Sequence, residues 1–535
     1  MTTTERTAFI NGKIYTVDPN NAWADTIIVD KNKISFVGKY PDAEKLINGN
    51  CSVVDLKGKL VLPGFIDSHA HIVIGGNYLL GVNLEDCKSK QEFIDRLKVH
   101  VQNNPVGWVK GGNWNHQNWE KIELPNKNWI DDFSEETPIL VHRLDYHMAI
   151  ANSAALKLAN ITKDTPDPNG GKIERDIKTG EPTGILKDKA ITLVSGVMPK
   201  QTNEQIDTAC LTALREAAKY GITSIQDITL EEDLLALKRI HAAGKLNCRI
   251  YARLPIDLGK GKIKDFINDL SGNEKIKLKS VKAFADGSLG SSTALFFECY
   301  NDDPENFGLA MDYVISGELE KLANYFDNEK LQLSIHAIGD KAVSDIIDMF
   351  EKIENENPKW DRRFRIEHAQ HINKKDIRRV AEMGIIVSAQ PYHLYYDGVW
   401  AEKKIGSKRL DDFLPFNSLQ ENDVKLCFGS DYPVVTLNPL KGIYAAVTRD
   451  TENKNHSNGL VPEEKITVED AVQAYTIDAA YSAYEENEKG SLKVGKFADF
   501  IVLEKNIFEI PAEEIADVKV EKTIFDGRVI YRNEK

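Results

Sequence analysis

Long apolar runs and an excess of positive charge are both missing from this sequence of 535 residues. No segment approaches the roughly 20 consecutive apolar residues of a membrane-spanning helix, and Met1–Thr7 includes no apolar stretch typical of a secretory signal. The 68 Lys and Arg residues are outnumbered by 82 Asp and Glu residues, which gives a formal net charge of −14. Such a chain is poorly suited to nucleic acid or to an anionic membrane surface. We therefore expect a cytoplasmic protein with neither as its partner.

Cysteine is scarce and follows no pattern. The six cysteines are scattered along the chain and form no C-x-x-C pair. Their spacing argues against a disulfide framework or a zinc ribbon and predicts free thiols. What is present, 42% hydrophobic and 28% charged residues, is typical of a globular protein. The length suits several domains, or one barrel with additions.

Short apolar runs separated by turn residues occupy both ends of the chain. Asn11-Gly12 and Asp526-Gly527 are hairpin turn signals that lie beside such runs. Neither end is large enough to bury a core by itself. We therefore predict that residues 1–62 and 486–535 form one composite β-sandwich domain, rather than two independent β-appendages.

The middle of the chain, residues 63–485, alternates apolar strands with segments of helix length. Helical patterns at 208–220 and 231–243, for example, each lead to a strand. Eight strands joined by such connectors predict an α/β fold, the (β/α)8 TIM barrel. The strands are expected at 60–66, 221–227, 249–254, 280–286, 332–336, 363–368, 385–390 and 425–431. Residues 76–190 interrupt this rhythm and are predicted to form an inserted cap subdomain, in which clustered tryptophans are more typical of core than of ligand contacts.

Two histidines follow the first predicted barrel strand, in the order His69-Ala70-His71. Side chains at positions i and i+2 of an extended segment point to the same side, so both imidazoles can reach one ion. Asp67 is expected to orient a ligand or to bond nearby backbone. By itself the pair is also compatible with two ordinary strand histidines.

Other strands also end in residues that can bind a metal or move a proton. Active sites of (β/α)8 barrels lie at the C-terminal ends of the strands. Imidazoles and a carboxylate are ligands suited to Zn²⁺ and similar ions. Lys282 is different, because a protonated amine cannot bind a cation; it either binds an anionic substrate group or has reacted with CO2 to give a carbamate. The predicted set is His69, His71, Lys282, His336, His368 and Asp431.

Five segments together carry a resemblance to a known family: 63–71, 281–291, 334–340, 365–370 and 428–433. They resemble the amidohydrolase superfamily, and in particular its branch related to N-substituted formamide deformylase. The resemblance implies a divalent metal site at the mouth of the barrel, with two zinc ions favoured over one. It assigns His69, His71, His336 and His368 as ligands, Lys282 as a carboxylated bridging ligand, and Asp431 as a ligand and general acid/base.

The expected activity is metal-dependent hydrolysis of a non-peptide carbon–nitrogen bond in an amide, an N-substituted formamide or a cyclic amide. Metal-bound hydroxide would attack the carbonyl, while Asp431 takes the water proton and delivers it to the leaving nitrogen. Two alternatives stay open: a deaminase of an amino-substituted ring, and a non-catalytic regulatory or binding protein on a barrel scaffold.

Further residues near the predicted strand ends are candidates for binding a small-molecule substrate. Asp286 can serve this role or cap the turn at 287–290. Glu367 is interpreted as structural, because alternation along the strand points it away from His368. A homodimer is a reasonable expectation, since symmetric oligomers are common. The substrate-binding candidates are Asp286, Gln390, His393, Asp145 and His147.

Overall fold

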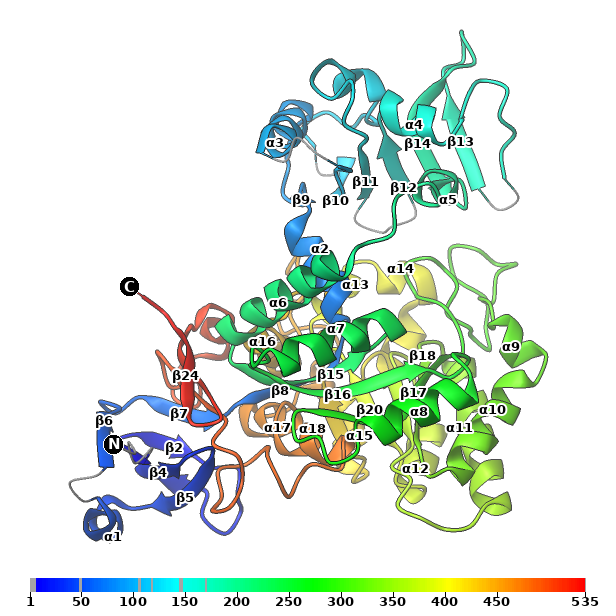
Figure 1. Ribbon diagram of the computed structural model, residues 1–535. Helices are drawn as coiled ribbons and strands as arrows, with labels where there is room; N and C mark the ends of the chain where they lie inside the picture. Colours follow the sequence, from blue (N-terminus) through cyan, green and yellow to red (C-terminus); the bar gives the residue numbers. More distant parts are fainter. Residues whose placement is uncertain are drawn as a thin grey trace. The chain divides into compact units, whose positions relative to one another are not determined.

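Figure 1 shows the computed structural model, which describes residues 6–47, 51–103, 107–116, 119–143, 148–168 and 171–534. The chain divides into two compact units. The inserted unit comprises residues 73–213, and the main unit comprises residues 1–72 together with 214–535. The predicted insertion at 76–190 falls inside the inserted unit. Among the described residues, no helix is both long and apolar enough to cross a membrane.

Eight parallel strands form the central sheet of the main unit, and their order in the sheet follows their order in the chain. Ala70 forms a parallel bridge with Tyr432, and the Asp431 N–H donates to the His69 carbonyl at 2.6 Å. The last strand therefore meets the first, as a barrel requires. The strands are β8 (Phe65–Ala70), β15 (Ile222–Ile228), β16 (Arg249–Pro255), β17 (Ile276–Phe284), β18 (Gln332–Ala337), β19 (Arg365–His368), β20 (Ile386–Ala389) and β21 (Leu426–Phe428).

The apolar run before His69 belongs to two sheets, whereas the sequence predicted one strand over 60–66. Strand β7 (Leu60–Pro63) pairs with the terminal strands, and β8 starts the barrel. Between them, the Gly64 N–H donates to the Asp499 carbonyl at 3.0 Å, and a Cβ at Gly64 would lie 2.2 Å from Thr223 Oγ1. Glycine therefore lets the chain change sheets in a space without room for a side chain.

Helices connect the barrel strands and lie outside them (Figure 1). In α11 the buried residues Val343, Ile346, Ile347 and Phe350 recur at helical spacing and form the inward face. The helices are α6 (Asn203–Lys219), α7 (Glu231–Ala242), α8 (Lys260–Asp269), α9 (Asp312–Ile315), α10 (Glu318–Asn328), α11 (Asp340–Glu356), α12 (Lys374–Glu382), α13 (His393–Asp397), α14 (Ala401–Ile405), α15 (Phe416–Glu421), α16 (Pro439–Thr448), α17 (Val468–Ala474) and α18 (Ile477–Ser482).

Both ends of the chain contribute strands to one β-rich domain. Ile501 of β22 lies opposite Leu62 of β7, and the rings of Phe9 and Phe500 pack edge to face at 4.9 Å. The first sheet has the order β5-β4-β1-β6, and the second β24-β23-β22-β7-β2-β3. Their strands are β1 (Arg6–Ile10), β2 (Lys13–Tyr15), β3 (Trp23–Ala24), β4 (Thr26–Asp30), β5 (Lys33–Gly38), β6 (Cys51–Asp55), β22 (Phe500–Leu503), β23 (Val520–Phe525) and β24 (Arg528–Arg532), with the short helix α1 (Tyr40–Ala43).

The inserted unit has its own sheet and its own core. Trp114 and Trp119 are buried beside Phe93, and Trp129 packs against the same cluster, so these tryptophans are core residues. The sheet order is β13-β14-β12-β11-β10-β9. The elements are α2 (Ile72–Leu80), β9 (Val82–Asn83), α3 (Lys90–Asn103), β10 (Gly111–Trp114), β11 (Leu140–Arg143), β12 (Met148–Ala151), α4 (Ser153–Leu158), β13 (Gly171–Arg175), β14 (Pro182–Asp188) and α5 (Ile191–Ser195).

These arrangements confirm the predicted fold class: an α/β (β/α)8 barrel with a β-sandwich built from both chain ends and a subdomain inserted after the first barrel strand.

Candidate metal centre

A first group of potential metal ligands forms where the first and last barrel strands meet. His69 lies in β8, His71 follows it, and Asp431 lies just after β21. Asp431 Oδ1 is 3.3 Å from His69 Nε2 and 3.2 Å from His71 Nε2. One ligand atom from each of these residues lies within 4.8 Å of the others. Two imidazole nitrogens and a carboxylate oxygen thus converge, as a divalent cation requires.

A second group shares Asp431 and adds residues from β19 and α13. His368 ends β19, and His393 begins α13. His393 Nε2 lies 3.9 Å from Asp431 Oδ2, and the ligand atoms of His368, His393 and Asp431 all lie within 4.8 Å of one another. The ring centroids of His69 and His368 are 4.8 Å apart. The two groups are therefore adjacent parts of one site at the C-terminal ends of the strands.

The backbone departs from ordinary conformations at two of these residues. His368 has a φ of 71° and Asp431 a φ of 59°, in the left-handed region that residues with a side chain rarely adopt. Each comes directly after a strand or close to its end, so the turn redirects the side chain toward the mouth of the barrel. Strained backbone of this kind is concentrated at functional sites.

The Nδ1 atoms of two histidines form hydrogen bonds with neighbouring side chains. His69 Nδ1 lies 2.5 Å from Glu367 Oε2, and His368 Nδ1 lies 2.6 Å from Gln390 Oε1. Both partners are oxygen acceptors, so each Nδ1 carries the hydrogen and each Nε2 keeps its lone pair for a ligand. This pattern of oriented imidazoles is typical of metal sites. The residues present therefore fit a divalent ion.

The charge states of the group also suit metal binding. Burial lowers the pKa of His69 to about 3, and it holds the pKa of His368 well below the usual range, so both imidazoles are neutral at pH 7. Burial favours the neutral form of Asp431, but His69 and His71 outweigh it and hold the pKa of the carboxyl well below its usual value. Neutral imidazoles and an ionised carboxylate are the forms that bind a cation.

Lys282 and His336 lie beside these groups without joining them. Lys282 in β17 is buried, and its amine donates to the Ala283 carbonyl at 3.1 Å. His336 in β18 has its ring centroid 4.5 Å from that of His368, and its Nε2 lies 3.0 Å from the Gly287 carbonyl oxygen. Burial lowers the pKa of Lys282 to about 7. A neutral amine is therefore accessible at this position near neutral pH.

Asp67 and Asp286 act on the backbone around the site. Asp67 Oδ1 accepts the N–H groups of His69 and Ser430, each at 3.0 Å, and so ties β8 to the segment after β21. Asp286 is fully buried, and its oxygens accept the N–H groups of Leu295, Ile338 and Gly339. This arrangement does not favour the predicted contact of Asp286 with substrate. The predicted alternative was a cap of the turn at 287–290, but these bonds instead join Asp286 to Leu295 and to the segment at 338–339.

The remaining substrate-binding candidates have different outcomes. Gln390 is buried and bonded to His368, so it orients that ring. His393 belongs to the second ligand group. Asp145 and His147 lie outside the described residues. Sequence reasoning missed the contact between Glu367 and His69; the available signal was the pair Arg365 and Glu367, two opposite charges on one face of a buried strand.

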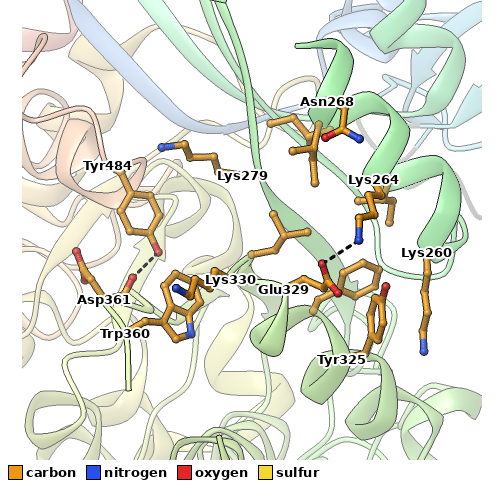
Figure 2. A pocket seen from close by; sticks show the side chains of 15 residues that line it. Lys260, Lys264, Asn268, Lys279, Tyr325, Glu329, Lys330, Trp360, Asp361 and Tyr484 are labelled. Atoms are coloured by element: carbon orange, nitrogen blue, oxygen red, sulfur yellow. Dashed lines mark hydrogen bonds and ion pairs between the residues drawn. The ribbon is translucent and has the colours of Figure 1, made fainter. Parts of the chain in front are cut away.

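A cavity elsewhere on the barrel contains none of the predicted site residues. It has a volume of about 570 Å³ and is lined by α8, by α10 and by the segment around Trp360 (Figure 2). Several lysines line it together with Tyr325, Trp360 and Tyr484. Leu278, in the first half of β17, lines this cavity, whereas Lys282 lies in the second half. The cavity is therefore not the mouth of the barrel.

Comparison with known proteins gives matches over nearly the whole chain. The model of the family described as "Amidohydrolase family" matches residues 52–531. The protein LONG AFTER FAR-RED 3 of Arabidopsis thaliana is 37% identical over 97% of this chain and 91% of its own length. The N-substituted formamide deformylase of Arthrobacter pascens is 26% identical over 98% of this chain and 97% of its own. This match confirms the predicted branch of the superfamily.

A solved structure shows the same architecture. The crystal structure of an uncharacterized metal-dependent hydrolase from Pyrococcus horikoshii OT3 superposes with a TM-score of 0.79 at 27% identity, covering 95% of this chain and 99% of that one. The predicted enzyme class, an amidohydrolase acting on carbon–nitrogen bonds other than peptide bonds, is confirmed by the family match. The chain belongs to the amidohydrolase family.

Proposed function

We propose that this chain hydrolyses a carbon–nitrogen bond of a small molecule that is an amide, an N-substituted formamide or a cyclic amide. The observation that carries the proposal is the convergence of imidazole nitrogens with the Asp431 carboxylate, within 4.8 Å in each group. The site lies at the C-terminal ends of the barrel strands, where enzymes of this fold carry out their chemistry. The likeness to an N-substituted formamide deformylase supports an amide-type substrate.

Zinc is the ion that we propose for this site. His69, His71, His368 and Asp431 would hold it, and a second ion, which we favour, would also involve His336 and Lys282. Nitrogen and carboxylate donors of this kind are typical of zinc sites. When bound, such an ion lowers the pKa of water toward neutrality and polarises a carbonyl oxygen.

We further propose that Lys282 carries a carbamate. Burial lowers the pKa of its amine to about 7, which supplies the neutral, nucleophilic form. The nitrogen would form a bond to the carbon of CO2 and lose a proton, which leaves an anionic group with two oxygens. The protonated amine of Lys282 is a cation that would repel a metal ion, whereas the carbamate is an anion that would bind one.

Asp431 is the residue that we propose moves the proton. Its carboxylate is ionised and lies beside the imidazole nitrogens of His69 and His71. It would accept a proton from the attacking water and deliver it to the leaving nitrogen, because an amide nitrogen leaves poorly without one. His393, 3.9 Å from Asp431, would contact the substrate.

We propose that the protein acts in the cytoplasm on a small molecule, as a homodimer, with neither nucleic acid nor membrane as a partner.

The test is a substrate panel assayed with zinc-loaded enzyme. The panel contains N-substituted formamides, linear amides, cyclic amides and amino-substituted rings. We expect hydrolysis of at least one amide class, with kcat lowered about 10²–10⁴-fold in Asp431→Asn and KM changed far less. Ammonia release from the amino-substituted rings alone would instead identify a deaminase. No turnover by enzyme that holds zinc would contradict the proposal.

A further inference from the structure

Charged side chains lie inside the barrel, directly beneath the candidate metal centre. Arg253 of β16 and both Arg365 and Glu367 of β19 have no exposed surface. Barrel interiors are commonly filled by branched apolar side chains, and burying charges is costly unless they are paired. A fully buried group of two cations and one anion is therefore a feature to be explained.

Glu367 contacts both arginines, the hydroxyl group of Ser334 and a predicted metal ligand. Its Oε1 lies 2.5 Å from Arg253 Nη1 and 2.5 Å from Arg365 Nε. Its Oε2 lies 2.5 Å from His69 Nδ1. Both guanidinium groups are permanent cations that can only donate hydrogen bonds, so the carboxyl group that they contact is held as a carboxylate. The side chain is therefore an ionised acceptor that faces His69.

The same two arginines also hold the backbone next to His69. Arg253 Nη2 donates to the Ser68 carbonyl oxygen at 3.1 Å, and Arg365 Nη2 donates to the same oxygen. The peptide that precedes His69 and the ring of His69 are thus fixed by one buried group. Because Ser68 precedes His69 directly, a shift of the arginines would move the backbone of that histidine.

An ionised carboxylate can only accept a hydrogen bond, so His69 Nδ1 must carry the hydrogen. The neutral ring then has its lone pair on Nε2, the atom that lies 3.3 Å from Asp431 Oδ1. In metal sites a carboxylate on the second ring nitrogen fixes the tautomer and the orientation of the ligating histidine.

We propose that Glu367 is a positioning residue that fixes the Nδ1–H tautomer and the orientation of His69, and that Arg253 and Arg365 hold Glu367 in place. The inference rests on the metal site in the proposed function. The competing explanation is an ion triad that only stabilises the barrel. The two explanations differ in the zinc affinity that they predict for Glu367→Gln, and only the positioning role requires the Nδ1–H tautomer of His69.

The first experiment measures zinc affinity by competition with a chelator for the wild type, Glu367→Gln and Asp327→Asn. Asp327 is the matched control, because it is a fully buried carboxylate that pairs with Arg362 at 2.9 Å and contacts no site residue that the structure records. We expect Glu367→Gln to bind zinc about 10–100-fold more weakly. Asp327→Asn should lower the thermal midpoint but bind zinc as the wild type does.

The second experiment needs neither metal nor a folded variant at position 367. Nitrogen-15 NMR of the metal-free wild type reports the tautomer of each histidine, and the His69 signals are assigned by their loss in His69→Gln. We expect an Nδ1–H tautomer for His69; an Nε2–H tautomer would overturn the inference. Equal zinc affinity of Glu367→Gln and wild type would overturn it as well. A wild type that binds no zinc but shows the Nδ1–H tautomer would instead count against the proposed function.

Discussion

Gly429 allows the end of the last barrel strand to approach the first candidate ligand. A Cβ at this position would lie 2.4 Å from the His69 backbone nitrogen and 2.8 Å from Asp67 Oδ1. Both distances are far below normal contact, and Asp67 is already bonded to the backbone of His69 and Ser430. The position of His69 relative to Asp431 therefore depends on the absence of one methyl group.

Gly429→Ala is expected to displace His69 and lower both stability and zinc content. Overpacking of this kind costs about 1–3 kcal/mol of unfolding free energy, and a displaced ring would leave the ligand group incomplete. The control is Gly261→Ala, where no heavy atom lies within 4 Å of the added Cβ and a small gain is expected. Thermal melting and elemental analysis measure both effects; unchanged zinc content in Gly429→Ala would contradict this account.

Residue types at strand ends were predictable, but their hydrogen-bond partners were not. His69, His71, His368 and Asp431 stand out because each follows an apolar strand, and the barrel brings such positions together. Glu367 and Gln390 contact ligands on other strands or on other turns, so their roles depend on barrel closure and on local backbone such as the positive φ of His368. The pair of Arg365 and Glu367 on one face of β19 indicated a buried ion pair, but the spacing along one strand does not show which ligand on another strand Glu367 contacts.

At the scale of elements, the N-terminus of α7 contains a carboxyl group with a raised pKa. Asp233 is 8% exposed, and its Oδ2 accepts the Leu230 N–H at 3.2 Å. Burial, assisted by Asp227, raises the pKa of Asp233 from 3.8 to about 7. Between these two values the folded protein holds a proton that the unfolded chain releases. Protonated Asp233 therefore contributes in full to the free energy of unfolding when the pH is below the ordinary pKa of 3.8. This contribution is lost as the pH rises through about 7.

Asp233→Asn should remove this part of the pH dependence. The amide keeps an oxygen that can accept the Leu230 N–H but cannot ionise. Between about pH 5 and about pH 8, the thermal midpoint of the metal-free wild type should fall by roughly 2–4 °C more than that of the variant. Scanning calorimetry of both proteins at the two pH values measures this difference. Parallel pH profiles would show that Asp233 titrates normally.

Element boundaries were less predictable than the elements themselves. Helix α6 begins at Asn203, five residues before the predicted start at 208, because Thr202 and Gln205 form reciprocal hydrogen bonds that cap it. The strand predicted at 60–66 is split at Gly64, and periodicity could not show this, because the residues on both sides are buried. In both cases local hydrogen bonding or steric fit decides the boundary.

At the scale of the whole molecule, the two chain ends depend on one another. The core that contains Phe9 and Ile14 also contains Phe500, Val502 and Ile524. The small size of each end made this pairing predictable, because neither end has enough apolar surface for its own core. The order of the strands in the sheet of the inserted unit was not predictable, because strands and helices do not alternate regularly along this part of the chain.

Deleting residues 490–535 should unfold the N-terminal strands as well. The deletion removes β22, one of the two strands that pair with β7, and it removes Phe500, Val502 and Ile524 from the core that contains Phe9. The remaining strands would therefore lose one neighbouring strand and a large part of their core. Limited proteolysis should cleave the truncated chain within residues 6–62, while a chain that lacks only Glu534 and Lys535 resists. Resistance of the N-terminal strands in the truncated protein would show that they fold independently.

The metal content per chain is the quantity on which the proposed function depends most closely. Elemental mass spectrometry would compare the wild type, purified without chelator, with Lys282→Ala and with Asp431→Asn. We expect close to two zinc equivalents in the wild type, with a clear fall in both variants. A wild type that holds no metal, even after reconstitution with zinc and bicarbonate, would contradict the proposed hydrolytic site.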